Sequence, residues 1–200
     1  MNPRSLVVVS AGLSQPSSTR LLADRLAAAA VAASDIPLDV RVVELRDLAH
    51  DIANHLLTGF PPAALKDALD AVEAADALIA VSPIFSGSYS GLFKSFFDVL
   101  DKDALAGKPV LIAATAGTAR HSLALEHALR PLFAYLRAMV VPTSVFAAAD
   151  DWGADSADGL LQARITRAAG ELTRELRHRA PVEVADPFAL TVDFEELLNS

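Results

Sequence analysis

The stretch LVVVSAGLSQPSSTRLLADRL, residues 6–26, passes from a short apolar run through a polar loop into a segment with helical spacing. The run 6–10 is rich in β-branched valine, which is typical of a buried strand. Beyond the loop, leucines and alanines recur at intervals of three and four residues, which is typical of a helix with one apolar face. The stretch therefore predicts a strand, a loop and a helix in succession.

The same succession recurs along the chain and predicts an α/β fold. Four of the five predicted strands are apolar almost throughout, as strands buried on both faces of a parallel sheet are. The fifth, 38–45, alternates apolar and charged residues and predicts a sheet edge. We therefore expect a doubly wound parallel sheet with right-handed crossovers and helices on both faces. The predicted strands are 6–10, 38–45, 77–82, 109–115 and 139–146, and the predicted helices are 18–33, 62–75, 90–101, 121–138 and 157–178.

Length and composition limit the class of protein. Two hundred residues, 52 % hydrophobic and 21 % charged, predict a single globular domain over 1–180, followed by an irregular tail over 181–200. A formal net charge of −8, with lysines and arginines scattered singly, argues against nucleic-acid binding. No apolar run approaches the roughly 20 residues of a membrane helix, so we expect a cytoplasmic protein without a membrane partner.

The chain has no cysteine, which excludes disulfides, thiolate metal sites and a cysteine nucleophile. Its five histidines form no cluster with metal-ligand spacing. The sequence therefore predicts no bound metal.

Three loops are expected to form a ligand site. In an open α/β sheet, ligands bind at the carboxyl ends of the strands. The loops 10–18, 82–90 and 115–122 follow predicted strands and are rich in serine, threonine and glycine, whereas 34–37 and 101–108 at the opposite edge are not. This asymmetry places the predicted site at the carboxyl edge.

The first loop has the composition of an anion site. Hydroxyls and the free amides of a helix N-terminus bind anions, and Arg20 adds a cation in the first helical turn. The alternative is an ordinary N-cap, which needs only one hydroxyl. Gly12 stands alone, so the glycine-rich motifs of P-loop and dinucleotide sites are missing, and a terminal monophosphate is the predicted ligand. The hydroxyls belong to Ser10, Ser14, Ser17, Ser18 and Thr19.

The second loop, SPIFSGSYSGLFKSFFD over 82–98, predicts a flat apolar ligand. Pro83 directs the backbone out of the sheet. Apolar side chains follow where solvent is expected, unless they fold back onto the core, and the next residues present backbone amides to the polar edge of the ligand. The GSYSG segment places Tyr89 where a serine hydrolase carries its nucleophile, which excludes that class. The apolar residues are Ile84, Phe85 and Tyr89, and the amides are those of Ser86, Gly87 and Ser88.

The third loop, TAGTARHSLALEH over 115–127, offers small residues and free amides. The amides of Gly117 and Thr118 are suited to the carbonyls of a planar ring. His121 is either a general acid or a capping or surface residue. A monophosphate pocket, an apolar clamp and a carbonyl-binding loop together describe a site for FMN.

Three segments carry a family resemblance: SAGLSQPSSTR, SPIFSGSYSGLFKSFFD and ATAGTARHSLALEHALRPLFAYLRA. The SPIF segment among them is similar to the motif P-x-Y-x-x-S-x-x-x-x-L-K-x-x-x-D. Over about residues 6–175 the chain resembles the NAD(P)H-dependent FMN reductases of the flavodoxin-like superfamily, most of all those that accompany luciferase-like monooxygenases. Two departures are Phe85, which replaces the usual tyrosine, and Gly12, which stands where relatives often have a Gly-Ser pair.

The resemblance implies a fold, a reaction and a set of contacts. The fold is a flavodoxin-like five-stranded parallel sheet with strand order 2-1-3-4-5. The reaction is hydride transfer from NADPH or NADH to FMN, without a catalytic residue that can be named. Lys94 and Asp98 are implied to be structural or at a dimer interface. The implied FMN contacts are Ser10, Gly12, Ser17, Ser18, Thr19 and Arg20 around the phosphate, Pro83, Ile84, Phe85, Ser86 and Ser88 along the isoalloxazine, and Gly117 and Thr118 at its pyrimidine edge.

Several alternatives stay open. The resemblance also fits a quinone or azo-dye reductase, or a flavodoxin-like electron carrier that does not react with NAD(P)H. It implies a homodimer or homotetramer and a luciferase-like monooxygenase that receives reduced FMN. The apolar face of 91–100 predicts either a subunit interface or core packing, through Leu92, Phe93, Phe96 and Phe97.

Overall fold

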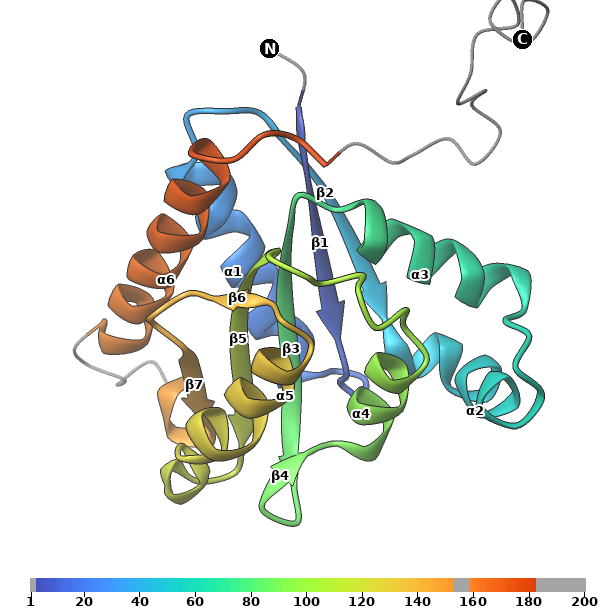
Figure 1. Cartoon of the computed structure of the whole chain (residues 1–200). Coiled ribbons are helices and arrows are strands. Elements are labelled where there is room, and N and C mark those ends of the chain that lie inside the picture. The colour runs from blue at the N-terminus through green and yellow to red at the C-terminus, as the bar shows by residue number, and fades with distance from the viewer. Residues whose placement is uncertain (1–2, 153–158, 183–200) are drawn as a thin grey trace, which may run out of the picture.

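The computed structural model describes residues 3–152 and 159–182, and in them a parallel sheet lies between two layers of helices (Figure 1). Residues 183–200 of the predicted tail lie outside the described residues. Four long parallel strands lie in the order β2, β1, β3, β5. The α/β parallel sheet with helices on both faces is therefore confirmed. The long strands are β1 (Arg4–Ser10), β2 (Leu38–Glu44), β3 (Ala77–Phe85) and β5 (Pro109–Ala116).

The predicted five-strand sheet with the order 2-1-3-4-5 is wrong in detail, since the sheet has seven strands and its path runs β2-β1-β3-β5-β6. The predicted strand 139–146 is divided into β6 (Met139–Val140) and β7 (Val145–Ala148), which both pair with β5.

Side chains from other elements form hydrogen bonds with the backbone between β6 and β7. The guanidinium of Arg130 donates to the carbonyls of Val141 and Pro142, at 3.3 and 3.2 Å. The amide of Thr143 donates to the Glu171 carboxylate at 2.7 Å. Pro142 has no N–H to give to a neighbouring strand. The strand is interrupted because its polar groups are satisfied elsewhere.

The predicted loop 82–90 contains a tight hairpin. β3 continues to Phe85, and β4 (Ser88–Tyr89) pairs antiparallel with its end. The two turn residues, Ser86 and Gly87, have φ values of 50° and 84°. Positive φ at both central positions is the geometry of a two-residue hairpin turn that matches the twist of its strands. The hairpin projects from the carboxyl edge of the sheet (Figure 1).

The helices divide between the two faces of the sheet because alternate strand residues point to opposite faces. Leu6 and Val8 pack with α1 (Ser18–Ala33) and α6 (Leu160–Arg177). Val7 and Val9 belong to the core on the other face, which α3 (Ala63–Ala74), α4 (Gly91–Asp98) and α5 (Arg130–Tyr135) cover. The predicted helix 18–33 has the observed bounds of α1.

Two segments differ from the predicted helices. The predicted helix 121–138 is divided into a 3-10 turn (Ala119–His121), a π-helical turn (Leu125–Leu129) and the short α5. Sequence reasoning missed α2 (Ala49–Thr58) and the 3-10 turn before it. Gly59, at φ 76°, ends α2 in the left-handed conformation that glycine adopts without steric cost.

The aromatic side chains of α4 form core contacts. Phe93, Phe96 and Phe97 are buried, and the ring centroid of Phe97 lies 4.7 Å from that of Phe93 and 5.0 Å from that of Phe133. The structure therefore supports core packing rather than a subunit interface for these rings. On the exposed side of α4, Lys94 and Asp98 form an ion pair.

Within 3–152 and 159–182, no helix combines the length and the apolar character that crossing a membrane requires.

Candidate functional site

Three loops surround one cavity at the carboxyl edge of the sheet. Its volume of about 340 Å³ is that of a small ligand site. Residues 13–14 and 17–19 line it from the first loop, 83–85 from the second and 115–117 from the third. We call this space the edge cavity. The structure thus brings the three predicted loops together.

Seven of the thirteen predicted contacts line the edge cavity: Ser17, Ser18, Thr19, Pro83, Ile84, Phe85 and Gly117. Six do not line it: Ser10, Gly12, Arg20, Ser86, Ser88 and Thr118. Leu13, Thr115 and Ala116 line the cavity although they were not predicted as contacts. Their only signal in the sequence is their place in the two polar loops.

The N-terminus of α1 presents free hydrogen-bond donors. The Ser17 hydroxyl caps the helix by accepting from the Arg20 amide at 3.2 Å. The amides of Ser18 and Thr19 have no acceptor among the described residues. Ser10 is the last residue of β1, and its buried hydroxyl has no hydrogen-bond partner among the described residues. These donors suit an anion, and no carboxylate of residues 3–152 or 159–182 lines the edge cavity.

One predicted hydroxyl ligand instead connects two loops. Thr19 and Thr115 are both buried, and their hydroxyl oxygens lie 2.8 Å apart in a hydrogen bond. This bond fixes the first turn of α1 against the end of β5. The first loop and the third loop therefore keep a defined separation.

Position 12 requires glycine because its backbone lies very close to Ser17 and Thr19. A Cβ on Gly12 would overlap the Ser17 hydroxyl and would lie 3.1 Å from the Ser17 Cβ and 3.2 Å from the Thr19 Cβ. Its backbone is therefore packed directly against the first turn of α1. Gly12 sets the shape of the loop without lining the cavity.

Arg20 is directed toward carboxylates rather than into the edge cavity. Its Nε donates to Asp24 at 2.8 Å, and its guanidinium also pairs with Glu44 at the end of β2. The hydrogen bond to Asp24 and the charges of both carboxylates raise the pKa of Arg20. The two carboxylates balance its charge, which leaves the anion to hydroxyls and amides.

The two aromatic residues of the second loop, Phe85 and Tyr89, have different environments. One fits a ligand contact and the other fits core packing. Phe85 lines the edge cavity and stays 49 % exposed, as expected of a ligand contact. Tyr89 packs on Phe93, with 5.8 Å between ring centroids, as expected of a core residue. The hairpin turn between them separates the two environments.

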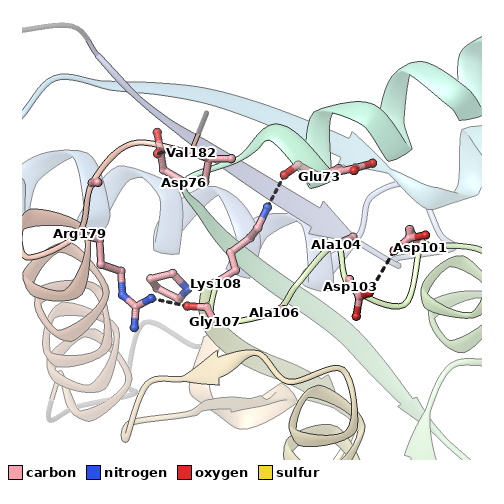
Figure 2. Close-up of a pocket in the computed structure, with 12 residues that line it drawn as sticks. Glu73, Asp76, Asp101, Asp103, Ala104, Ala106, Gly107, Lys108, Arg179 and Val182 are labelled. Atoms are coloured by element: carbon pink, nitrogen blue, oxygen red, sulfur yellow. Dashed lines mark hydrogen bonds between the residues drawn. The ribbon is translucent and has the colours of Figure 1, made fainter. Parts of the chain in front are cut away.

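Another cavity, with a volume of about 670 Å³, lies at the opposite edge of the sheet (Figure 2). Four carboxylates line it, from Glu73, Asp76, Asp101 and Asp103, beside Lys108 and Arg179. The Lys108 ammonium donates to the carbonyls of Val72 and Glu73 at 2.6 and 2.7 Å, at the end of α3. This cavity therefore disfavours an anion, and Lys108 serves as a helix cap.

The Lys108 ammonium is expected to make stability depend on pH. Burial lowers its pKa from 10.5 to about 8. Between these values the unfolded chain keeps a proton that the folded chain has released, so the free energy of unfolding should rise with pH. The rise is about 1 kcal/mol per pH unit. Chemical denaturation from pH 7 to 10.5 measures it, and Lys108→Met should flatten the curve. Equal slopes in both proteins would contradict this assignment.

Most of the chain matches a known protein family. Residues 4–153 match the model described as NADPH-dependent FMN reductase. An FMN reductase (NADPH) of Pseudomonas aeruginosa is 43 % identical over 151 residues, which are 76 % of this chain and 80 % of the relative. The NADH-dependent FMN reductase SfnF of Pseudomonas fluorescens is 39 % identical over 150 residues, 75 % and 79 % of the two chains.

Two solved structures have the same overall fold as this chain. An oxidoreductase from Corynebacterium diphtheriae has a TM-score of 0.86 and 47 % identity, with 90 % of this chain and all of that one covered. The apo form of the NADH:FMN oxidoreductase EmoB has a TM-score of 0.78 and 34 % identity, with 88 % and 91 % covered. The similarity therefore extends over nearly the whole of both folds.

Proposed function

Because this chain belongs to the family of NADPH-dependent FMN reductases, we propose that its edge cavity holds FMN between the three loops. The protein is an NAD(P)H-dependent FMN reductase that uses FMN and a nicotinamide cofactor. The main support for the proposal is that one cavity is lined both by the N-terminus of α1, which suits an anion, and by the apolar residues 83–85.

The phosphate of FMN fits the donors at the start of α1. The amides of Ser18 and Thr19, with the nearby hydroxyls, supply hydrogen bonds without adding a counter-charge. Ser10, at the end of the adjacent strand, has a buried hydroxyl without a hydrogen-bond partner among the described residues, and this hydroxyl does not line the edge cavity. Arg20 contributes by holding α1 against β2 through Glu44.

The isoalloxazine ring fits the wall formed by the second and third loops. Pro83 and Ile84 are buried at its base, and Phe85 offers a half-exposed aromatic face. The backbone of Gly117 lies at the same cavity without a side chain that would cover it. Ser86, Ser88 and Thr118 belong to the same two loops but do not line the edge cavity.

The side chains of the edge cavity are suited to positioning rather than to proton transfer. No titratable side chain lines it in the described part of the chain. The chemistry that FMN supplies when bound is acceptance of a hydride from the nicotinamide. The protein then needs to bind the two rings face to face and to orient them.

Purified protein should oxidise NADPH or NADH rapidly only when FMN is added. The decisive measurement is anaerobic loss of nicotinamide absorbance with FMN, with riboflavin and with neither. Riboflavin lacks the phosphate, so its KM should exceed that of FMN at least about tenfold if the loop binds phosphate. FMN binding without NAD(P)H oxidation would instead identify an electron carrier, and no FMN binding would refute the site.

We also propose that reduced FMN leaves the protein and serves a flavin-dependent monooxygenase of the luciferase-like type. The half-exposed Leu13 and Phe85 show that the edge cavity opens to solvent, which favours exchange. Ultrafiltration after anaerobic reduction should then place reduced FMN in the filtrate. A quinone or azo-dye reductase would retain its flavin on the protein.

We propose that the protein is a homodimer or homotetramer. Leu57 and Phe60, at the end of α2 and just beyond it, are 87 % and 81 % exposed. Tyr135 at the end of α5 is exposed to a similar extent. Apolar side chains of this size favour contact with another subunit, and sedimentation velocity measures the number of subunits.

A further inference from the structure

A second cavity is lined by continuations of two of the loops that line the edge cavity. Its volume is about 410 Å³, and it is lined by Gly87 and Ser88 of the hairpin and by residues between 120 and 128. The hairpin strand that supplies 83–85 to the edge cavity continues into Gly87, and the loop that supplies 115–117 continues into Arg120. The two cavities therefore lie along the same pair of backbone segments. We call the second one the basic cavity.

The basic cavity is positively charged in a negatively charged protein. Arg120, His121 and His127 are its only ionisable lining residues, and no carboxylate lines it among the described residues. The net charge of the chain is −8. A cavity with this lining is therefore a local exception to the overall charge and favours an anionic group.

Of the three basic residues that line the cavity, His127 lies near the Glu126 carboxylate and helps to lower its pKa, whereas Arg120 pairs with no carboxylate among the described residues. Glu126, on the same π-helical turn as His127, is held by Arg130 at 3.0 Å and by the Ser144 hydroxyl at 2.9 Å. No carboxylate pairs with Arg120 within 3–152 and 159–182, in contrast to Arg130 and Arg137. Within that part of the chain, no carboxylate competes with a ligand for the Arg120 guanidinium.

We propose that the basic cavity receives the 2′-phosphate of NADPH and that Arg120 makes this protein prefer NADPH to NADH. The inference rests on the proposed function. A nicotinamide ring placed against the wall of the edge cavity leaves the remainder of the dinucleotide to extend along the same two segments. NADPH and NADH differ there by one phosphate, and a guanidinium binds a phosphate through two parallel hydrogen bonds. His121 and His127 add donors at the same wall.

Relatives of similar identity use different nicotinamides. One at 43 % identity is named for NADPH and one at 39 % for NADH. Membership of the family therefore does not decide the preference of this chain, and the residues of the basic cavity are needed to decide it.

The test compares the two nicotinamides in two arginine variants. Arg120→Ala should lower kcat/KM for NADPH about tenfold or more and leave kcat/KM for NADH within about twofold. Arg174→Ala, an exposed arginine on α6 outside both cavities, is the matched control and should change neither. Arg120→Lys should restore part of the NADPH activity, because the charge returns without the paired hydrogen bonds.

A binding measurement gives an independent readout. Calorimetric titration of the FMN-loaded protein should show tighter binding of 2′,5′-ADP than of 5′-ADP, and Arg120→Ala should abolish the difference. Equal losses with NADPH and NADH, or no loss with either, would overturn the proposal. Wild-type protein that oxidises NADH with FMN while failing these tests would keep the proposed function and lose only this inference.

Discussion

Replacement of Phe93 by alanine should lower the free energy of unfolding by about 3–5 kcal/mol. The ring is fully buried at the centre of an aromatic group, with centroid distances of 4.7 Å to Phe97, 5.8 Å to Tyr89 and 6.2 Å to Phe133. Alanine would remove these contacts and leave a void that the rigid neighbours fill only in part. Urea denaturation at neutral pH measures the change.

Phe85→Ala is the matched control for Phe93. Its ring is 49 % exposed, so the same substitution should change the free energy of unfolding by less than about 1 kcal/mol. A similar loss in both variants would contradict the assignment of α4 to the core. Little loss in either would show that the aromatic group can collapse around the void.

Gly12→Ala should reduce the affinity for FMN at least about tenfold, because the loop must move to admit a Cβ. The new methyl group would overlap the Ser17 hydroxyl, which caps α1, and would press on the Thr19 Cβ at 3.2 Å. Movement of these residues would displace the Ser18 and Thr19 amides, which we propose bind the phosphate. The quenching of flavin fluorescence on titration with protein measures the affinity.

Gly91→Ala is the control for a glycine replacement. A Cβ on Gly91 meets no atom within 4 Å, and Gly91 is the first residue of α4. FMN affinity should therefore be unchanged in Gly91→Ala. If Gly12→Ala also binds FMN with wild-type affinity, the phosphate does not lie at the start of α1.

The fold was predictable where local pattern and final contacts agree. Helix 18–33 has a serine cap, a regular apolar spacing and a buried face, and its predicted bounds are those of α1. The segment 139–146 has the composition of a strand, but Arg130 and Glu171 bind its backbone from α5 and α6. No pattern within the segment reveals those partners, so the interruption could not be predicted.

The candidate site could also be predicted only in part. The three polar loops could be assigned to one edge of the sheet from their position after buried strands. The individual roles depend on contacts between distant parts of the chain, such as the Thr19 to Thr115 bond and the pairing of Arg20 with Glu44. These contacts join residues that are far apart in the sequence, so no local pattern could predict them.

The hairpin turn at Ser86 and Gly87 has a consequence for the divergence of these enzymes. It separates the edge cavity from the basic cavity, yet both turn residues are exposed and lie outside the hydrophobic core. Insertions and exchanges at such a tip are tolerated far better than changes in the sheet. A longer turn would therefore change the basic cavity, where we propose that part of the nicotinamide cofactor binds, without changing the hydrophobic core.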